Sequence, residues 1–163
     1  MKASMQRPSS YAVIDLETTG FGSSDRIIEI GVVLLDHNCE VQKTWETLVQ
    51  PHRDVPNTFV HHLSASDLVD APTFADIAGE LATLLHGRTM VAHNASFEVR
   101  FLTREFGRLG VALPSYGTWV LDTMVLFGQA FPQHRRSLGE ALRVTGISNE
   151  RPHTALADAA ATA

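Results

Sequence analysis

Apolar residues gather in short runs in the first third of the chain, and turn-forming residues separate these runs. Residues 11–17, 26–36 and 40–49 are rich in aliphatic and β-branched side chains, which is typical of β-strands. His37 and Asn38 stand between the second and third runs, where a hairpin connection belongs. The pattern therefore predicts that the fold begins with three strands in a meander.

The rest of the chain alternates between helical and extended patterns. Apolar residues recur at helical spacing over 73–86 and 94–109, and a glycine follows each segment as a stop signal. The remaining predicted elements are strands over 88–92 and within 114–122, helices over 123–131 and 137–146, and a last helix from about Thr154. This order of strands and helices predicts an α/β fold in which helices pack on a mixed sheet.

Residues 51–72 form a polar, irregular connection that is longer than most, and such connections are often functional. Within it, Ser64-Ala-Ser-Asp67 has the composition of a helix N-cap, and we expect a short helix there. Ser137-Leu-Gly-Glu140 has the spacing of a capping box at the start of the penultimate helix.

Length and composition indicate one folded domain. The chain has 163 residues, of which 44% are hydrophobic and 19% charged. We expect residues 1–10 to be a polar extension and residues 11–163 to form the domain. No apolar run is long enough to cross a bilayer, so no membrane is expected as a partner. The last helix reaches Ala163 without a stop signal, from which we expect the chain to be part of a longer protein.

Cysteine content and net charge narrow the possible functions only slightly. The single cysteine, Cys39, excludes an internal disulfide and a multi-cysteine zinc site, and it fits a cytoplasmic location. A net charge of −5 predicts weak long-range attraction to phosphate. A site that concentrates carboxylates also lowers the net charge until cations bind, so a nucleic-acid partner is not excluded.

Two carboxylates lie close together in the first predicted strand. Asp15 and Glu17 point to the same face, because side chains alternate along a strand. Neighbouring carboxylates repel each other and lose hydration when buried, and a divalent cation offsets both effects. The alternative for this pair is the solvated end of an edge strand.

Two further pairs of polar residues lie where helices begin. Asn94 and Glu98 follow the strand over 88–92, at the kind of strand end where open α/β sheets bind their ligands. His153 and Asp158 stand at the start of the last helix, from which both side chains can reach one cleft. Taken singly, each pair is also explained by helix capping or by simple exposure.

The order of these motifs resembles that of the DEDDh exonucleases, a family that includes the proofreading epsilon subunit of bacterial replicative DNA polymerases. The resemblance runs from about Tyr11 to the end of the chain. The motifs that carry it are Asp15-x-Glu17, His93-Asn-x-x-Phe-Glu98, His153-x4-Asp158 and, in the irregular connection, Val60-His-His-Leu-Ser64. The resemblance implies a ribonuclease-H-like fold, with a mixed five-stranded sheet flanked by helices.

The resemblance also implies a reaction and its catalytic residues. Asp15, Glu17, Glu98 and Asp158 would hold two divalent ions, Mg²⁺ or Mn²⁺, about 4 Å apart around a scissile phosphate. His153 would take the proton from the attacking water, since the pKa of histidine is close to neutrality. The implied activity is the release of nucleoside 5′-monophosphates from a DNA 3′ end in proofreading or repair, with a DNA polymerase or other replication and repair proteins as partners.

A second set of residues is implied to contact the substrate: Thr18, His61, Leu63, Asn94 and Phe97. Thr18 is placed to meet the terminal 3′ hydroxyl, and His61 to meet the substrate backbone. Leu63 and Phe97 are apolar candidates to stack on or wedge beside the last bases. For Phe97, packing in the core is the alternative.

Glu98 departs from the family pattern, which has aspartate at this position. The extra methylene displaces the carboxylate, and displacements near 1 Å can cost on the order of 100-fold in rate. Three interpretations stay open: a backbone that compensates, a slower enzyme that prefers Mn²⁺, or a weakened site that still binds nucleic acid. An RNA exonuclease is the other alternative, because local contacts to the 2′ hydroxyl are not visible in a sequence.

Overall fold

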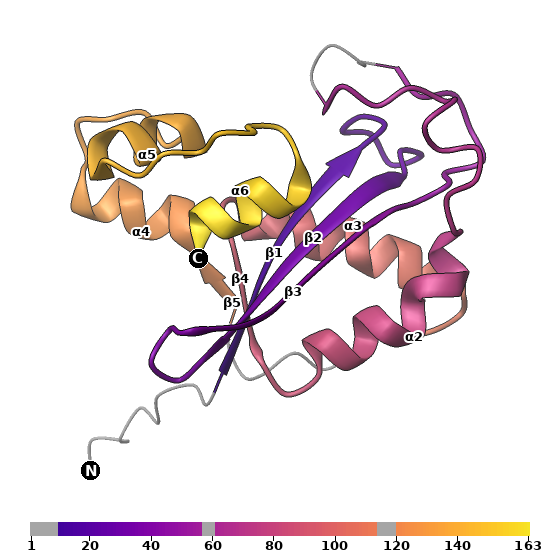
Figure 1. Ribbon diagram of the computed structural model, residues 1–163, viewed down its shortest axis with the longest axis horizontal. Helices are drawn as coiled ribbons and strands as arrows, with labels where there is room; N and C mark the ends of the chain where they lie inside the picture. The colour runs from indigo at the N-terminus through magenta and orange to yellow at the C-terminus, as the bar shows by residue number, and fades with distance from the viewer. Residues whose placement is uncertain (1–9, 57–60, 114–119) are drawn as a thin grey trace.

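Strand β1 (Ser10–Thr18) lies at the centre of a mixed five-stranded sheet in the computed structural model, which describes residues 10–56, 61–113 and 120–163 (Figure 1). The strand order is β3-β2-β1-β4-β5. β2 (Ile27–Asp36) and β3 (Val41–Leu48) run antiparallel to their neighbours, whereas β4 (Thr89–Ala92) and β5 (Val120–Asp122) continue the sheet in the direction of β1. The predicted meander and mixed sheet are both confirmed.

Helices cover both faces of the sheet, and the alternation of side chains along β1 divides the core between them. Ile14 and Leu16 point to the face where α2 (Phe74–Leu85) and α3 (Ala95–Arg108) form the larger apolar cluster. Val13 points to the other face and packs with Ala159 of α6 (Ala155–Thr162). In Figure 1, α6 lies in front of the sheet and α3 behind it.

The backbone of the first residues of α6 packs directly against the backbone of β2 at Gly31. A methyl group on Gly31 would lie 2.3 Å from the carbonyl carbon of Ala155 and 2.3 Å from the nitrogen of Leu156. Since Gly31 pairs with Asp15 across β2 and β1, this close approach places the first turn of α6 over the acidic part of β1.

A buried ion pair fixes the turn between β1 and β2 against α3. Glu105 is 1% exposed and accepts hydrogen bonds from Nε and Nη2 of Arg26, at 2.7 and 2.9 Å. Inside the turn, the Asp25 carboxylate accepts a hydrogen bond from the amide of Gly22 at 2.7 Å. These contacts order the segment that carries Phe21 next to the strand end.

The predicted elements match the observed ones closely, including α4 (Thr123–Ala130) and α5 (Leu138–Thr145), which begins at a Ser137 cap. The predicted helix near Ser64–Asp67 is wrong: residues 65–70 form consecutive turns. Leu68 is the only buried residue among them, so there is no apolar face to stabilise a helix. Residues 1–9 of the predicted extension, Val60 and the first part of 114–122 lie outside the described residues. No helix in the described ranges is long and apolar enough to span a membrane.

Gly31→Ala is expected to lower the free energy of unfolding by about 1–3 kcal/mol, because the methyl group would collide with backbone atoms that cannot rotate away. Gly79→Ala is the matched control, since Gly79 is an exposed residue of α2 with no atom within 4 Å of the new methyl group. That change is expected to leave stability unchanged or raise it by up to about 1 kcal/mol. Urea unfolding measures both variants, and a wild-type midpoint for Gly31→Ala would contradict the close contact.

Candidate active site

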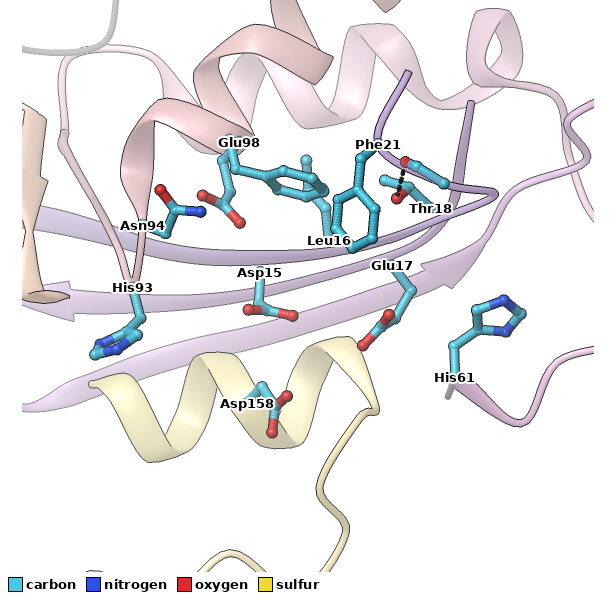
Figure 2. A pocket seen from close by; sticks show the side chains of 12 residues that line it. Asp15, Leu16, Glu17, Thr18, Phe21, His61, His93, Asn94, Glu98 and Asp158 are labelled. Atoms are coloured by element: carbon cyan, nitrogen blue, oxygen red, sulfur yellow. Dashed lines mark hydrogen bonds between the residues drawn. The ribbon is translucent and has the colours of Figure 1, made fainter. Parts of the chain in front are cut away.

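A pocket of about 340 Å³ opens at the carboxyl end of β1 and collects most of the predicted site residues (Figure 2). The predicted residues that line it are Asp15, Glu17, Thr18, His61, Asn94, Phe97, Glu98 and Asp158. Leu63 and His153 are not among the lining residues. The motifs that the sequence separates by more than a hundred residues therefore meet at one end of the sheet.

Three elements supply the four carboxylates. Asp15 and Glu17 come from the central strand, Glu98 from the first turn of α3 and Asp158 from the first turn of α6. In Figure 2, the carboxylate of Glu98 points from α3 toward Asp15, while Asp158 approaches from α6 on the opposite side. The predicted convergence of these side chains is what the structure shows.

His153 joins part of this cluster. Ligand atoms of Glu17, His153 and Asp158 all lie within 4.8 Å of one another, whereas Asp15 and Glu98 do not belong to this tight group. His153 is exposed and has a left-handed backbone, with a φ of 65°. Its imidazole therefore stands at the edge of the carboxylate cluster, on a loop rather than on a helix.

Burial is the main cause of raised carboxyl pKa values in the pocket. It raises the pKa of Glu17 to about 8, with the charges of Asp158 and Glu29 adding to the effect. Burial also raises the pKa of Asp15 well above its usual range, and the charges of Glu98, Asp158 and Glu17 act in the same direction. The ionised cluster is thus unfavourable unless a cation neutralises it.

Burial also raises the pKa of Glu98, and one of its carboxylate oxygens has no hydrogen-bond partner among the described residues. Burial raises its pKa to about 8, and the neighbouring Asp122 contributes, although Arg100 opposes the shift. Glu98 is 3% exposed and its Oε2 has no hydrogen-bond partner among the described residues. Carboxylate oxygens with one imidazole suit hard divalent cations, so this donor set fits a metal site.

Asp122, rather than Asn94, caps the helix that carries Glu98. Asn94 occupies the N-cap position of α3, but its backbone is left-handed, with a φ of 83°, and its side chain makes no capping hydrogen bond. The Asp122 carboxylate accepts hydrogen bonds from the amides of Asn94 and Ala95 at 3.1 and 3.0 Å. It also accepts one from the amide of Met124 at 2.9 Å, so a single side chain at the end of β5 caps both α3 and α4.

Two hydrogen bonds orient Asp158 at the start of α6. Its Oδ1 accepts from the side-chain amide of Asn149 at 2.6 Å, and its Oδ2 accepts from the backbone amide of His153 at 3.3 Å. The first residue of α6, Ala155, donates its amide to Glu29 of β2 at 3.2 Å. The carboxylate of Asp158 is therefore held from the loop that also carries His153.

Two of the predicted substrate-contact residues, Thr18 and His61, make hydrogen bonds within the protein. Thr18 donates its hydroxyl to the carbonyl of Gly20 at 2.8 Å, which shapes the turn beside the pocket. Both ring nitrogens of His61 are engaged, since Nδ1 accepts from the amide of Leu63 at 3.2 Å and Nε2 lies 3.0 Å from the carbonyl oxygen of Pro56. His61 thus organises the connection that forms one wall, and its contact with a substrate backbone stays a prediction.

Aromatic side chains form another wall of the pocket. Phe97 packs against the larger core and also lines the pocket, and its contact with a substrate base stays a prediction. Its ring centroid lies 4.7 Å from that of Phe101 and 5.9 Å from that of Phe21. Phe21 is 79% exposed and was not predicted; its place between two glycines of an exposed turn was the available signal.

Three polar residues in or beside the pocket were not predicted as site residues, although His93 begins the His93-Asn-x-x-Phe-Glu98 motif. His93 lines the pocket and its Nε2 lies 2.7 Å from the carbonyl oxygen of Arg136. Glu29 could have been noticed in the sequence, because it is the one charged residue inside the aliphatic run of residues 27–35. Asp122 gave no distinctive local pattern.

The raised pKa values predict that the metal-free protein loses stability as the pH rises. The carboxyls of Glu17 and Glu98 have an ordinary pKa of 4.5 and a folded pKa of about 8, so the folded state binds more protons between these values. The free energy of unfolding therefore falls as the pH rises through this window. A divalent cation binds the ionised carboxylates and opposes the loss, so Mg²⁺ or Mn²⁺ should raise the Tm more at about pH 8 than at about pH 5.

Thermal unfolding with EDTA and with each metal measures this effect. The double variant Glu17→Gln, Glu98→Gln cannot ionise at either position, so its stability should fall less steeply with pH and respond less to metal than that of the wild type; Asp15 keeps part of both effects. Glu80→Gln, at an exposed position of α2, should keep both. A wild-type slope in the double variant would contradict the assignment.

Comparisons with known proteins agree with this geometry. The RNase T family model, described as an exonuclease, matches residues 12–163. The chain is 35% identical over 159 residues to DNA polymerase III subunit epsilon of Salmonella typhimurium, covering 90% of this chain and 65% of that protein. It is 34% identical over 160 residues to 3′-5′ exonuclease DinG of Staphylococcus haemolyticus, covering 95% of this chain and 17% of that protein.

A solved structure shares the fold. The nuclease domain of 3′hExo, a DEDDh family member bound to rAMP, superposes with a TM-score of 0.78 at 19% identity, covering 94% of this chain and 87% of that one. The chain spans less than two thirds of the length of the two curated relatives. The fold agrees with the family match, and because the family model covers almost the whole chain, this chain belongs to the RNase T family of exonucleases.

Proposed function

We propose that this chain is a metal-dependent 3′→5′ exonuclease that acts on DNA. The observation that carries the proposal is the cluster of Glu17, His153 and Asp158, whose ligand atoms lie within 4.8 Å of one another beside the half-buried carboxylate of Asp15 and the buried one of Glu98. This arrangement combines a cation-binding surface with an imidazole that can accept a proton from water. Together they can catalyse hydrolysis of a phosphodiester bond.

The residues divide the reaction between them. Asp15, Glu17, Glu98 and Asp158 would hold two divalent ions, Mg²⁺ or Mn²⁺, which supply neutralising charge for the phosphate and make the attacking water more acidic. His153 accepts a proton from that water as its oxygen bonds to phosphorus. The bond from phosphorus to the 3′ oxygen of the preceding nucleotide breaks, this oxygen takes a proton from solvent, and a nucleoside 5′-monophosphate leaves.

The pocket favours the end of a single strand. Phe21 and Phe97 offer an aromatic wall on which a terminal base can stack, while Leu16 supplies an apolar floor. A base that enters this space must have left its pairing partner, so single-stranded or frayed 3′ ends are the preferred substrates. Thr18, Asn94 and Leu63 complete the proposed substrate contacts.

DNA is preferred over RNA in this proposal because the relatives at 34–35% identity are named as a DNA polymerase III subunit and as DinG. A role in proofreading or repair, association with a DNA polymerase and a cytoplasmic location belong to the same proposal, with residues 11–163 as the exonuclease domain. RNA trimming is the second candidate, since the structure of 3′hExo that shares this fold holds rAMP.

His153→Ala should lower the rate of 3′ trimming by on the order of 100- to 10,000-fold, because the attacking water loses its base. Matched 5′-labelled single-stranded DNA, 3′-recessed duplex and RNA, incubated with Mg²⁺, Mn²⁺ or EDTA, show the products on a gel. His37→Ala, at the exposed hairpin on the opposite end of β2, is the control and should trim at the wild-type rate.

Wild-type protein should give a metal-dependent ladder that starts from the 3′ end of DNA. Cleavage of RNA alone would replace the DNA proposal with RNA trimming. Binding of DNA without cleavage under any metal would favour a nucleic-acid-binding module instead.

Glu98→Asp should raise kcat with Mg²⁺, by up to about 100-fold, because the shorter side chain restores the carboxylate position that the family uses. Steady-state kcat with Mg²⁺ and with Mn²⁺ measures the change, and Glu98→Gln serves as the variant without a charged ligand. An unchanged or lower kcat in Glu98→Asp would show that the backbone of α3 is already fitted to glutamate.

A further inference from the structure

Glu29 lies beside the catalytic carboxylates although no motif points to it. It sits directly opposite Glu17 in the register of β2 and β1, and it is 9% exposed. Directly opposed residues of antiparallel strands point to the same face, so Glu29 lies on the face that α6 covers. A carboxylate that is buried next to others needs a specific role to persist there.

The contact that Glu29 makes is with the backbone of α6. Its Oε2 accepts a hydrogen bond from the amide of Ala155 at 3.2 Å, in a buried position. Thr154, at the N-cap of α6, makes no side-chain cap, because its hydroxyl donates to the carbonyl of Arg151 at 2.9 Å. Glu29, which lies on β2, therefore supplies both the hydrogen-bond acceptor for the first amide of α6 and the negative charge that stabilises a helix N-terminus.

Ala155 lies between His153 and Asp158 in the sequence, at the start of α6. His153 holds a left-handed backbone with a φ of 65°, which is unfavourable without glycine and persists only where neighbouring contacts enforce it. One such contact is the hydrogen bond from its amide to Asp158 at 3.3 Å. The other is the attachment of Ala155 to Glu29, two residues along the chain. Gly31, on the same face of β2, allows the two backbones to touch.

We propose that Glu29 is a positioning residue that holds the start of α6 on β2 and so sets where His153 and Asp158 stand relative to Glu17. Its effect on catalysis rests on the proposed nuclease function, whereas its effect on the backbone does not. The rival role for Glu29 is that of a fifth metal ligand. The engagement of Oε2 with an amide supports positioning.

Glu29→Ala and Glu29→Gln separate these roles. Glutamine keeps an oxygen acceptor of the same reach and removes the charge, so it preserves a cap but makes a poor metal ligand. Glu80→Gln is the control, because Glu80 is an exposed glutamate on α2, which packs on the opposite face of the sheet from α6. If Glu29→Ala fails to fold, Glu29→Met fills the same space without an acceptor.

Amide hydrogen exchange of the metal-free protein measures directly whether Glu29 holds the Ala155 amide. Protection of the Ala155 amide should fall by about tenfold in Glu29→Ala and stay close to wild type in Glu29→Gln and Glu80→Gln. Unchanged protection in Glu29→Ala would overturn the proposal. This readout decides the matter even if the protein cuts no nucleic acid, in which case only the proposed function fails.

Steady-state kinetics of the Glu29 variants measure the effect of this positioning on catalysis. In Glu29→Ala, kcat should fall by on the order of 10- to 100-fold while KM changes little, and Glu29→Gln should recover most of the lost kcat. Equal losses in both variants, together with a higher Mg²⁺ requirement in both, would make Glu29 a metal ligand and overturn the positioning role.

Discussion

Mutual repulsion among buried carboxylates is the constraint around which this fold is arranged. Burial raises the pKa values of Asp15 and Glu17, and the negative charge of Asp158 raises both further. Without other support, such a cluster would spread apart or take up protons. The protein opposes this by placing its acids on elements that cannot move independently, with two on the central strand and one each in the first turns of α3 and α6. A helix N-terminus also favours negative charge, which reduces the penalty for Glu98 and Asp158.

The two helices that carry these acids begin in the same manner. Helix α3 donates its first amides to Asp122 at the end of β5, and α6 donates the amide of Ala155 to Glu29 of β2. In both cases the cap comes from the sheet instead of from the residue before the helix. The direction of each helix is thereby tied to a strand, and so is the carboxylate in its first turn. This solution adds still more negative charge around the pocket, which a bound cation would also offset.

The sequence predicted the parts of this site that depend on local periodicity. The shared face of Asp15 and Glu17 follows from the alternation of a strand, and the places of Glu98 and Asp158 follow from where helices begin. The caps could not be predicted, because Glu29 and Ala155 are 126 residues apart and Asp122 and Asn94 are 28 residues apart. Such pairs are set by tertiary packing.

The same limit explains the incorrect helix near Ser64–Asp67. Its polar residues have the composition of a cap, but a helix there would have had no apolar face to bury. The importance of Phe21 likewise depends on its distance from Phe97 in space, which a turn sequence does not reveal.

The absence of a side chain at Gly31 also determines which part of the protein can move the histidine. Because the backbone of α6 touches that of β2, α6 cannot roll or slide without collision between main-chain atoms. Any motion that carries His153 toward or away from the pocket is therefore confined to dihedral rotations in residues 149–153. A hinge of this kind works on the nanosecond to microsecond time scale of loops rather than on the slower scale of helix shifts. The imidazole can thus change its position while the carboxylates of Asp15 and Glu17 stay fixed on the central strand.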